Sequence, residues 1–352
     1  MRASDVDFVP VTDVLLRDPE LPYRCVLHVL GIATRFESNS SDAMAVVEDA
    51  FGAWREAGEP HPRIEDCAHV RIVVHEGCEH ADRSGGRVPV RHICPDPIRL
   101  VAHSPGSVAV SDPARREVVA YTTTELVACR ETFRSSIVEG MTLALLSHFD
   151  RHPLHAAAVG RGGRAILLAA PSGTGKSTLA YVAQRAGLDV ISEDHVWIQR
   201  EPQLRVWGWP GRVRLSADAI AHFPELARSG SPSFSNGKEK LAIDVGGTRS
   251  TIPRSAHSAV ICLLERAQDP VSLSRIGAKE LTDELLRQMA PGFDRFPGRQ
   301  RETMAALSAG GGWRLRLSSD PHEALPYLLR MLRDASDSLS PPAPRASSAS
   351  PT

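Results

Sequence analysis

The sequence contains very little lysine. Of its 41 Lys and Arg residues, only Lys176, Lys238, Lys240 and Lys279 are lysine. Because arginine serves as the general cation of this chain, each lysine is a candidate for a position that requires a compact, rotatable ammonium group, the alternative being a lysine retained by chance. The 42 acidic residues balance the basic ones to a formal net charge of −1, which argues against general binding to nucleic acid or to an anionic membrane surface.

The chain also lacks long apolar runs and paired cysteines. No stretch approaches the roughly 18 apolar residues that indicate a membrane-spanning helix, and the first residues form no apolar core of a secretory signal. None of the six cysteines has CxxC spacing, so reduced thiols in a cytoplasmic protein are the simplest interpretation. Histidines and cysteines between His75 and Cys94 fit no standard zinc pattern; we interpret them as a surface loop, with a metal site as the alternative.

Length and composition predict a soluble globular protein of about two domains. The chain has 352 residues, 42% of them hydrophobic and 24% charged. Residues 1–122 contain short apolar runs separated by turn signals, with a strand expected over residues 23–32 and a helix over residues 41–54. We expect a smaller α+β region of unknown role there. Ser, Pro and Ala dominate residues 335–352, which predicts a disordered tail.

A helical period begins after residue 123. The apolar residues that share one helical face are Leu126, Phe133, Ile137, Met141, Leu145 and Phe149. The spacing predicts a helix over residues 123–149, at the start of a second domain that spans residues 123–334. Two apolar runs follow, residues 155–159 and 165–170, and the polar turn between them predicts a β-hairpin.

The strongest signal is a phosphate-binding loop, APSGTGKST, at residues 170–178. It follows an apolar strand and opens a helix predicted over residues 176–186, which is the context that such a loop requires. Gly173 and Gly175 permit backbone conformations in which successive N–H groups converge on phosphate oxygens, and the helix N-terminus adds its dipole. The expected nucleotide-binding residues are Ser172, Gly173, Thr174, Gly175, Lys176, Ser177 and Thr178.

Two side chains of this loop have specific expected roles. Lys176 would reach the β- and γ-phosphates, and the Ser177 hydroxyl would ligate Mg²⁺. The usual motif begins with Gly where this chain has Ala170, a mild departure because the remaining positions fit. The loop therefore predicts ATP and Mg²⁺ as cofactors.

Two adjacent carboxylates follow the next expected strand. Residues 188–191 are predicted to form a short buried strand, and Glu193 and Asp194 stand at its carboxyl end, where ligands bind in such sheets. One carboxylate can hold Mg²⁺, and the other, with its pKa raised by its neighbour, can take a proton from an attacking hydroxyl. From position, we expect Glu193 to be the base and Asp194 to be the metal ligand beside Ser177. The alternative is a solvated loop.

Together these segments resemble the HPr kinase/phosphorylase-related kinases. The resemblance covers about residues 120–330 and rests on LHAAAV at 154–159, AILLAAPSGTGKSTLA at 165–180 and LDVISEDHVWI at 188–198. It implies an α/β fold with a phosphoenolpyruvate carboxykinase-like P-loop kinase domain. The group includes stand-alone serine kinases of peptide-modification clusters, among them kinases of the C-terminal serine of lasso peptide precursors.

The resemblance also implies roles for residues outside the loop. His155 matches a histidine beside the catalytic carboxylates, and Glu193 and Asp194 match an acidic pair that is commonly two aspartates. Lys240, in a segment that begins at residue 236, matches a basic loop that can neutralise charge on the transferred phosphoryl group. The alternatives are a structural histidine and a hairpin turn with solvated lysines. The glycine-rich signature of the bifunctional HPr enzymes has no match.

The sequence therefore predicts an ATP- and Mg²⁺-dependent kinase of a serine or threonine hydroxyl, with a peptide or small protein as acceptor. We expect it in the cytoplasm, with no nucleic-acid or membrane partner. A kinase of the same fold that acts on a small-molecule hydroxyl is one alternative. A non-catalytic nucleotide-binding regulatory module is another, and the paired carboxylates favour an enzyme over it.

Overall fold

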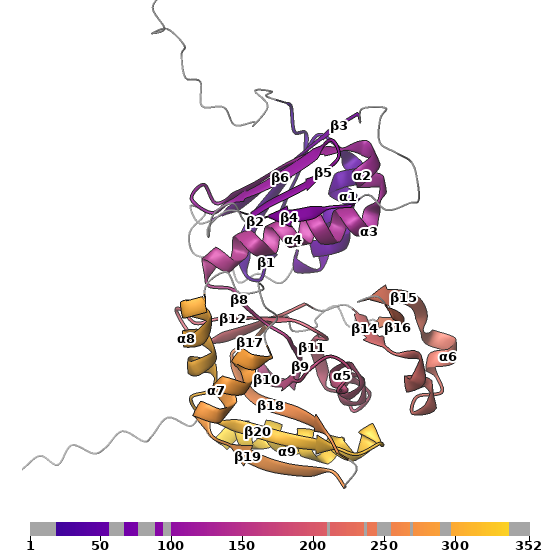
Figure 1. Cartoon of the computed structure of the whole chain (residues 1–352), viewed down its shortest axis with the longest axis vertical. Coiled ribbons are helices and arrows are strands. Elements are labelled where there is room, and N and C mark those ends of the chain that lie inside the picture. The colour runs from indigo at the N-terminus through magenta and orange to yellow at the C-terminus, as the bar shows by residue number, and fades with distance from the viewer. Residues whose placement is uncertain are drawn as a thin grey trace, which may run out of the picture. The chain divides into compact units, whose positions relative to one another are not determined.

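The chain forms two compact units, Met1–Arg151 and His152–Thr352. Each unit contains helices and its own sheets, in agreement with the expected α/β class (Figure 1). The computed structural model describes residues 19–55, 67–76, 89–93, 100–209, 212–235, 238–244, 255–267, 270–288 and 297–337. The expected tail beyond residue 337, residues 236–237, and Cys78, His80 and Cys94 lie outside the described residues.

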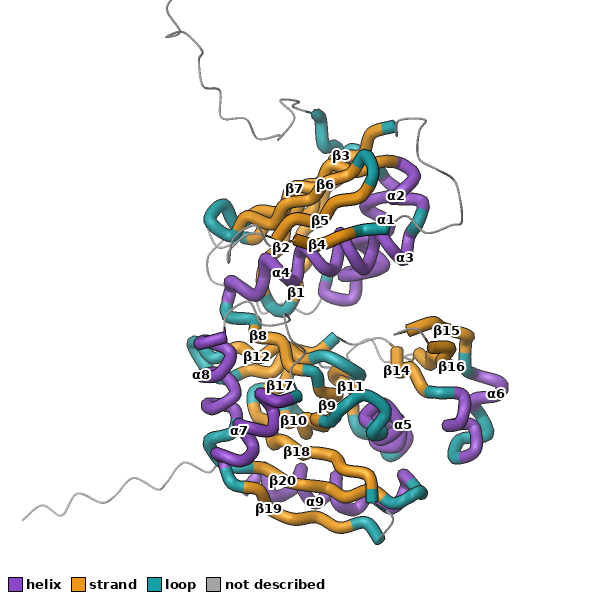
Figure 2. The backbone as a smooth tube through the Cα atoms, viewed as in Figure 1, coloured by secondary structure: helices purple, strands orange, loops and turns teal. Residues whose placement is uncertain are grey.

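The first unit contains a seven-stranded sheet with the order β1-β2-β3-β7-β6-β5-β4. Its strands are β1 (Tyr23–Val29), β2 (Ile32–Ser38), β3 (Ala68–His75), β4 (Arg91–Ile93), β5 (Leu100–Ser104), β6 (Ser107–Asp112) and β7 (Glu117–Thr123). Strands β2, β3 and β7 run parallel, and the other pairs are antiparallel. The helices of this unit gather on one side of the sheet (Figure 2).

The strand expected over residues 23–32 is in fact the start of a hairpin. Leu30 and Gly31 have φ values of 50° and 76°, which turn the chain back between β1 and β2. The helix expected over residues 41–54 is confirmed as α1 (Ser41–Phe51), followed by one 3₁₀ turn.

The single helix expected over residues 123–149 is interrupted. It consists of α2 (Thr124–Ala128), α3 (Arg130–Thr132), a π-helical segment (Phe133–Glu139), α4 (Gly140–Leu146) and a 3₁₀ turn (Ser147–Phe149). Its apolar face is buried except for Phe149, and α4 packs on β6 and β7 of the first unit. Because this packing ties the segment to the first sheet, the two units divide after residue 151 and not at residue 123, where the sequence placed the boundary.

The second unit is built on a six-stranded sheet with the order β11-β9-β10-β18-β20-β19. Its strands are β9 (Ala156–Arg161), β10 (Arg164–Ala169), β11 (Asp189–Ser192), β18 (Ser258–Arg266), β19 (Ser272–Ile276) and β20 (Gly312–Leu317). Strands β9 and β10 form the expected hairpin. Strands β10, β18 and β20 are parallel, so their carboxyl ends meet at one edge of the sheet.

Both faces of this sheet are covered. Helices α5 (Lys176–Arg185) and α9 (Leu325–Asp337) pack on one face, against side chains such as Ile166 and Leu168. The other face, with Ala165 and Leu167, packs against α7 (Ala278–Arg287), α8 (Pro297–Leu307) and a second sheet. Helix α9 continues to Asp337, so the expected start of the tail at residue 335 is too early.

Two small sheets complete the unit. One has the order β17-β13-β12-β8, and the other has the order β14-β16-β15. Their strands are β8 (His152–Leu154), β12 (Val196–Gln199), β13 (Arg205–Gly208), β14 (Arg212–Leu215), β15 (Ser231–Ser235), β16 (Lys238–Asp244) and β17 (Ser255–Ala256).

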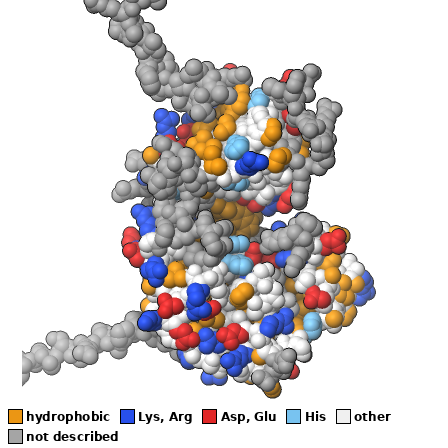
Figure 3. All heavy atoms as spheres, viewed as in Figure 1, with side chains coloured by type: hydrophobic (Ala, Val, Ile, Leu, Met, Phe, Trp, Pro, Cys, Tyr) orange, Lys and Arg blue, Asp and Glu red, His pale blue; other side chains and the backbone are white. Residues whose placement is uncertain are grey.

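Acidic and basic side chains are interspersed on the face of the second unit that Figure 3 presents. This agrees with the balanced composition. None of the helices in the described parts of the chain has the length and apolar character that a membrane span requires.

Gly208 lies where β13 packs closely against β11, the strand that leads to the candidate site. A substitution at Gly208 therefore tests this packing. A Cβ at Gly208 on β13 would lie 2.1 Å from the carbonyl oxygen of Ile191 on β11, the strand that leads to Glu193. Because backbone would have to move, we expect Gly208→Ala to lower the free energy of unfolding by about 2 kcal/mol. Chemical denaturation measures this quantity.

Gly298→Ala on α8 is the matched control. A Cβ at Gly298 meets no atom within 4 Å, and alanine favours the helix, so this variant should be as stable as the parent or slightly more stable. Equal losses in both variants, or no loss at Gly208, would contradict the described packing.

Candidate functional site

The phosphate-binding loop connects β10 to α5. Gly173 and Gly175 have φ values of 85° and 122°, which side chains with a Cβ rarely adopt. The Thr174 hydroxyl donates to the Pro171 carbonyl oxygen at 2.9 Å and closes the turn. Since Gly175 directly precedes α5, the free N–H groups of the first helical turn open into the loop and can bind an anion.

Lys176 is buried inside this loop, with 6% of its surface exposed. Its ammonium group donates to the carbonyl oxygens of Ala170 at 2.7 Å and Pro171 at 3.3 Å. Burial lowers the pKa of Lys176, and the nearby carboxylates of Asp194 and Glu193 act in the opposite direction. Lys176 therefore brings a poorly solvated cation to the place where the loop would hold phosphate.

Ser177 connects the loop to the first carboxylate. Its hydroxyl donates to Oε1 of Glu193 at 2.8 Å, and Arg214 lies 3.5 Å from Oε2. The Glu193 side chain is only 8% exposed, and burial raises its pKa despite the hydrogen bond from Ser177 and the charge of Arg214. The sequence interpretation placed Asp194 beside Ser177, whereas the structure places Glu193 there.

Asp194 lies between two histidines. Nε2 of His155 is 3.0 Å from Oδ1 of Asp194, and Nδ1 of His195 is 3.0 Å from Oδ2. The two imidazole rings stack with their centroids 5.2 Å apart. Burial by itself would raise the pKa of Asp194, but the hydrogen bonds from His155 and His195 outweigh it and hold the pKa well below its ordinary value. Asp194 is thus a fixed, ionised carboxylate.

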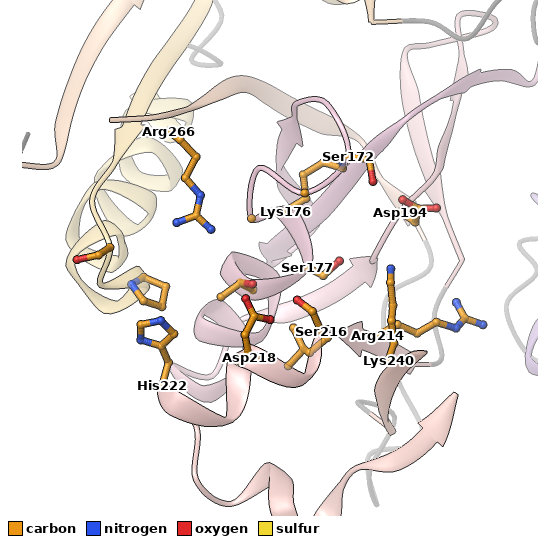
Figure 4. Close-up of a pocket in the computed structure, with 17 residues that line it drawn as sticks. Ser172, Lys176, Ser177, Asp194, Arg214, Ser216, Asp218, His222, Lys240 and Arg266 are labelled. Atoms are coloured by element: carbon orange, nitrogen blue, oxygen red, sulfur yellow. The ribbon is translucent and has the colours of Figure 1, made fainter. Parts of the chain in front are cut away.

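A cavity of about 210 Å³ extends along the loop (Figure 4). Asp194 lies at one end of it, together with Arg214 from β14 and Lys240 from β16, and His222 lies at the other end. Ser177 lies between them. One continuous space therefore connects the loop, a carboxylate and several cations.

Most predicted site residues line this cavity. They are Ser172, Gly173, Gly175, Lys176, Ser177, Thr178, Asp194 and Lys240. Thr174, His155 and Glu193 are not among the described residues that line it. His155 and Glu193 nevertheless belong to the same cluster, because they bond to Asp194 and Ser177 respectively.

Sequence reasoning missed several residues of the cavity wall. Arg266 stands at the carboxyl end of β18, and its guanidinium lies 3.6 Å from where a Cβ on Gly175 would be. Its place after an apolar run was a usable signal, because loops at that edge of a parallel sheet bind ligands. Asp218 and His222 gave no such signal, because they lie in and after a short 3₁₀ segment that no periodicity reveals.

A conventional metal cluster is absent from the parts of the chain that the structure describes. No group of three or more His, Cys, Asp or Glu side chains there is arranged to hold a metal ion. His75 and His92, from the histidine- and cysteine-rich segment, bond to the backbone carbonyl oxygens of Gly106 and Ser136, each at 3.0 Å.

Comparisons with known proteins give little beyond this geometry. No known protein family matches the chain, and no curated protein matches it. Among solved structures, it is similar to the HPr(Ser) kinase/phosphatase from Coxiella burnetii, with 11% sequence identity and a TM-score of 0.28. The similarity covers 53% of this chain and 99% of that chain. This is a weak structural relationship.

The two carboxylates should affect stability in opposite directions at pH 7. Glu193 has a raised pKa in the folded chain, so its contribution to stability is lost as the pH rises through that pKa. Asp194 has a depressed pKa, so its contribution is present above the unfolded-state pKa and is lost only as the pH falls. We expect Glu193→Gln to raise the melting temperature by roughly 2 °C and Asp194→Asn to lower it.

Thermal unfolding of both variants at pH 7 checks this prediction. Asp283→Asn, which removes an exposed carboxylate from α7, is the control and should leave the melting temperature unchanged. A shift of the same sign in both site variants would be inconsistent with their opposite surroundings.

Proposed function

We propose that the second unit binds ATP with Mg²⁺ and transfers the terminal phosphoryl group to a serine or threonine hydroxyl of a peptide or small protein. The observation that carries this proposal is the contrast between two adjacent carboxylates. Glu193 bonds to the hydroxyl of the phosphate loop, and Asp194 is fixed by two histidines at the cavity wall. A module that only bound nucleotide would need the first carboxylate and not the second.

The sequence motifs support the same proposal at the level of the family. Residues 154–159, 165–180 and 188–198 resemble HPr kinase-related kinases, and we propose a phosphoenolpyruvate carboxykinase-like nucleotide domain on that basis. In the structure these three segments contribute β9, β10, α5, β11 and β12, and the phosphate loop connects β10 to α5.

The cations of the cavity fit a polyphosphate. Backbone N–H groups of the loop and the ammonium of Lys176 would hold the phosphates, and Arg266 approaches the loop from β18 (Figure 4). Arg214 and Lys240 stand at the end where Asp194 lies, so they would neutralise charge on the phosphoryl group as it is transferred.

The donors near Ser177 fit Mg²⁺. The Ser177 hydroxyl and the Glu193 carboxylate are both oxygen ligands, and Mg²⁺ in nucleotide sites is bound by one or two carboxylates together with phosphate oxygens. A bound Mg²⁺ would neutralise charge that develops on the phosphates during transfer. Because Glu193 is the residue that contacts Ser177, we assign the metal to this pair, which reverses the roles expected from position along the chain.

Asp194 is then the residue that receives the proton of the acceptor. Its two oxygens each bond to one histidine nitrogen, so the carboxylate is fixed in place where it lines the cavity. The acceptor hydroxyl would donate to Asp194 and pass its proton to it as the oxygen–phosphorus bond forms and ADP leaves. A weak base is sufficient, because phosphoryl transfer passes through a loose transition state that needs positioning more than deprotonation.

Amide variants should separate these two roles. Glu193→Gln should raise the Mg²⁺ concentration needed for ATP binding, since a metal ligand acts in the ground state and the transition state alike. Asp194→Asn should leave ATP and Mg²⁺ binding nearly intact but lower phosphoryl transfer roughly 10²-fold or more. The measurements are calorimetry with ATP at several Mg²⁺ concentrations and transfer of labelled phosphate to a panel of serine-containing peptides.

Asp283→Asn is again the control and should match the parent in both assays. Free serine serves as a small-molecule acceptor, and preferential transfer to it would replace the peptide in the proposal. If the parent bound ATP but transferred phosphate to no acceptor, the chain would be a nucleotide-binding module. Full transfer activity in both amide variants would refute the mechanism.

A further inference from the structure

The direction of a bound nucleotide follows from the proposed function, on which this inference rests. The terminal phosphoryl group must lie beside Asp194 and the Ser177–Glu193 pair, because the proposed metal site and base are there. The nucleoside must then extend toward the other end of the same cavity, where His222 lies (Figure 4). That end has no role in the mechanism described so far.

This second end of the cavity differs in chemistry from the first. Two surface segments form it: the 3₁₀ segment around residues 216–222 and the turn after β20. The described residues of these two segments that line the cavity are Ser216, Asp218, Ala219, His222, Ser319 and Pro321. In Figure 4, Asp218 lies between Ser177 and His222. The polar side chains Asp218 and His222 are exposed to the cavity, whereas Ala219 and Pro321 are buried and form its floor.

The segment that carries Asp218 and His222 is anchored on the helix of the phosphate loop. Phe223, the residue after His222, is fully buried and packs edge-on against Tyr181 of α5 with the ring centroids 4.9 Å apart. Leu226 is fully buried in the same core. Since α5 begins at the loop, this packing fixes the backbone that carries Asp218 and His222 relative to the phosphate loop.

The charge of Asp218 indicates which part of a nucleotide it meets. A carboxylate disfavours a neighbouring phosphate, and at the Asp194 end this cost is offset by Arg214 and Lys240, which stand there. Asp218 would attract hydrogen-bond donors instead, and the two ribose hydroxyls are the donors of ATP that lie nearest to the phosphates. A carboxylate accepts hydrogen bonds from vicinal hydroxyls in other dinucleotide and nucleotide sites for the same reason.

We propose that Asp218 and His222 form a ribonucleoside subsite. Asp218 accepts hydrogen bonds from the ribose hydroxyls, and the imidazole of His222 lies against the face of the base, with Pro321 contributing apolar surface. The subsite selects nucleotides that carry both ribose hydroxyls over those that lack one, and it adds affinity that the phosphate loop alone does not supply.

Calorimetry of the full chain in Mg²⁺ tests the subsite with three probes: ATP, 3′-deoxy-ATP and inorganic tripolyphosphate. The parent should bind ATP about tenfold more tightly than 3′-deoxy-ATP. Asp218→Ala should weaken ATP binding about tenfold or more and remove the difference between ATP and 3′-deoxy-ATP. Tripolyphosphate should bind this variant as tightly as the parent, because it occupies only the loop.

Three further variants test the role of His222 and supply a control. His222→Ala should weaken ATP binding about fivefold without affecting tripolyphosphate, and His222→Phe should restore ATP binding because a flat ring remains. Asp283→Ala, which removes an exposed carboxylate far along the chain on α7, should bind all three probes as the parent does.

The outcomes separate this inference from the proposed function. Parental ATP affinity in Asp218→Ala, or an equal loss of ATP and tripolyphosphate binding, would overturn the subsite while the loop assignment stands. A parent chain that bound tripolyphosphate as tightly as ATP would overturn it as well. If the parent bound neither probe, the proposed nucleotide-binding function would itself be wrong.

Discussion

The hydrogen bond from Ser177 to Glu193 joins the first turn of α5 to the residues that follow β11, and the rest of the site depends on it. Glu193 is a buried carboxylate, so it needs a donor, and the loop hydroxyl supplies one at 2.8 Å. The contact fixes the loop against the end of β11. Because Gly208 admits β13 close to Ile191, the same strand also packs against β13.

Adjacent carboxylates acquire different properties here because their side chains leave the backbone in different directions. Glu193 turns to the loop and is buried, which raises its pKa, whereas Asp194 turns to His155 and His195, which lower its pKa. Two titratable groups whose surroundings separate their pKa values can serve as two parts of one reaction. The cavity then brings the cations and the nucleoside subsite to the same loop.

The sequence predicted the local parts of this arrangement and not the distant ones. Short patterns of glycine and apolar residues indicate the loop, the β9–β10 hairpin and α5, so the sequence alone predicted these elements. The bond between His155 and Asp194 spans 39 residues and was expected only from a family resemblance. Tertiary packing alone brings Arg266 and Asp218 to the cavity, and it also decides that Ser177 meets Glu193, so periodicity could not predict these contacts.

The Mg²⁺ dependence of ATP binding in Ser177 variants tests the central claim most directly. Ser177→Thr keeps a hydroxyl, so it should bind ATP at the Mg²⁺ concentration that the parent needs. Ser177→Ala removes one of the two proposed oxygen ligands, so it should need about tenfold more Mg²⁺ while its Mg²⁺-free affinity for ATP stays unchanged. If the alanine variant kept the Mg²⁺ dependence of the parent, the Ser177–Glu193 pair would not be the metal site.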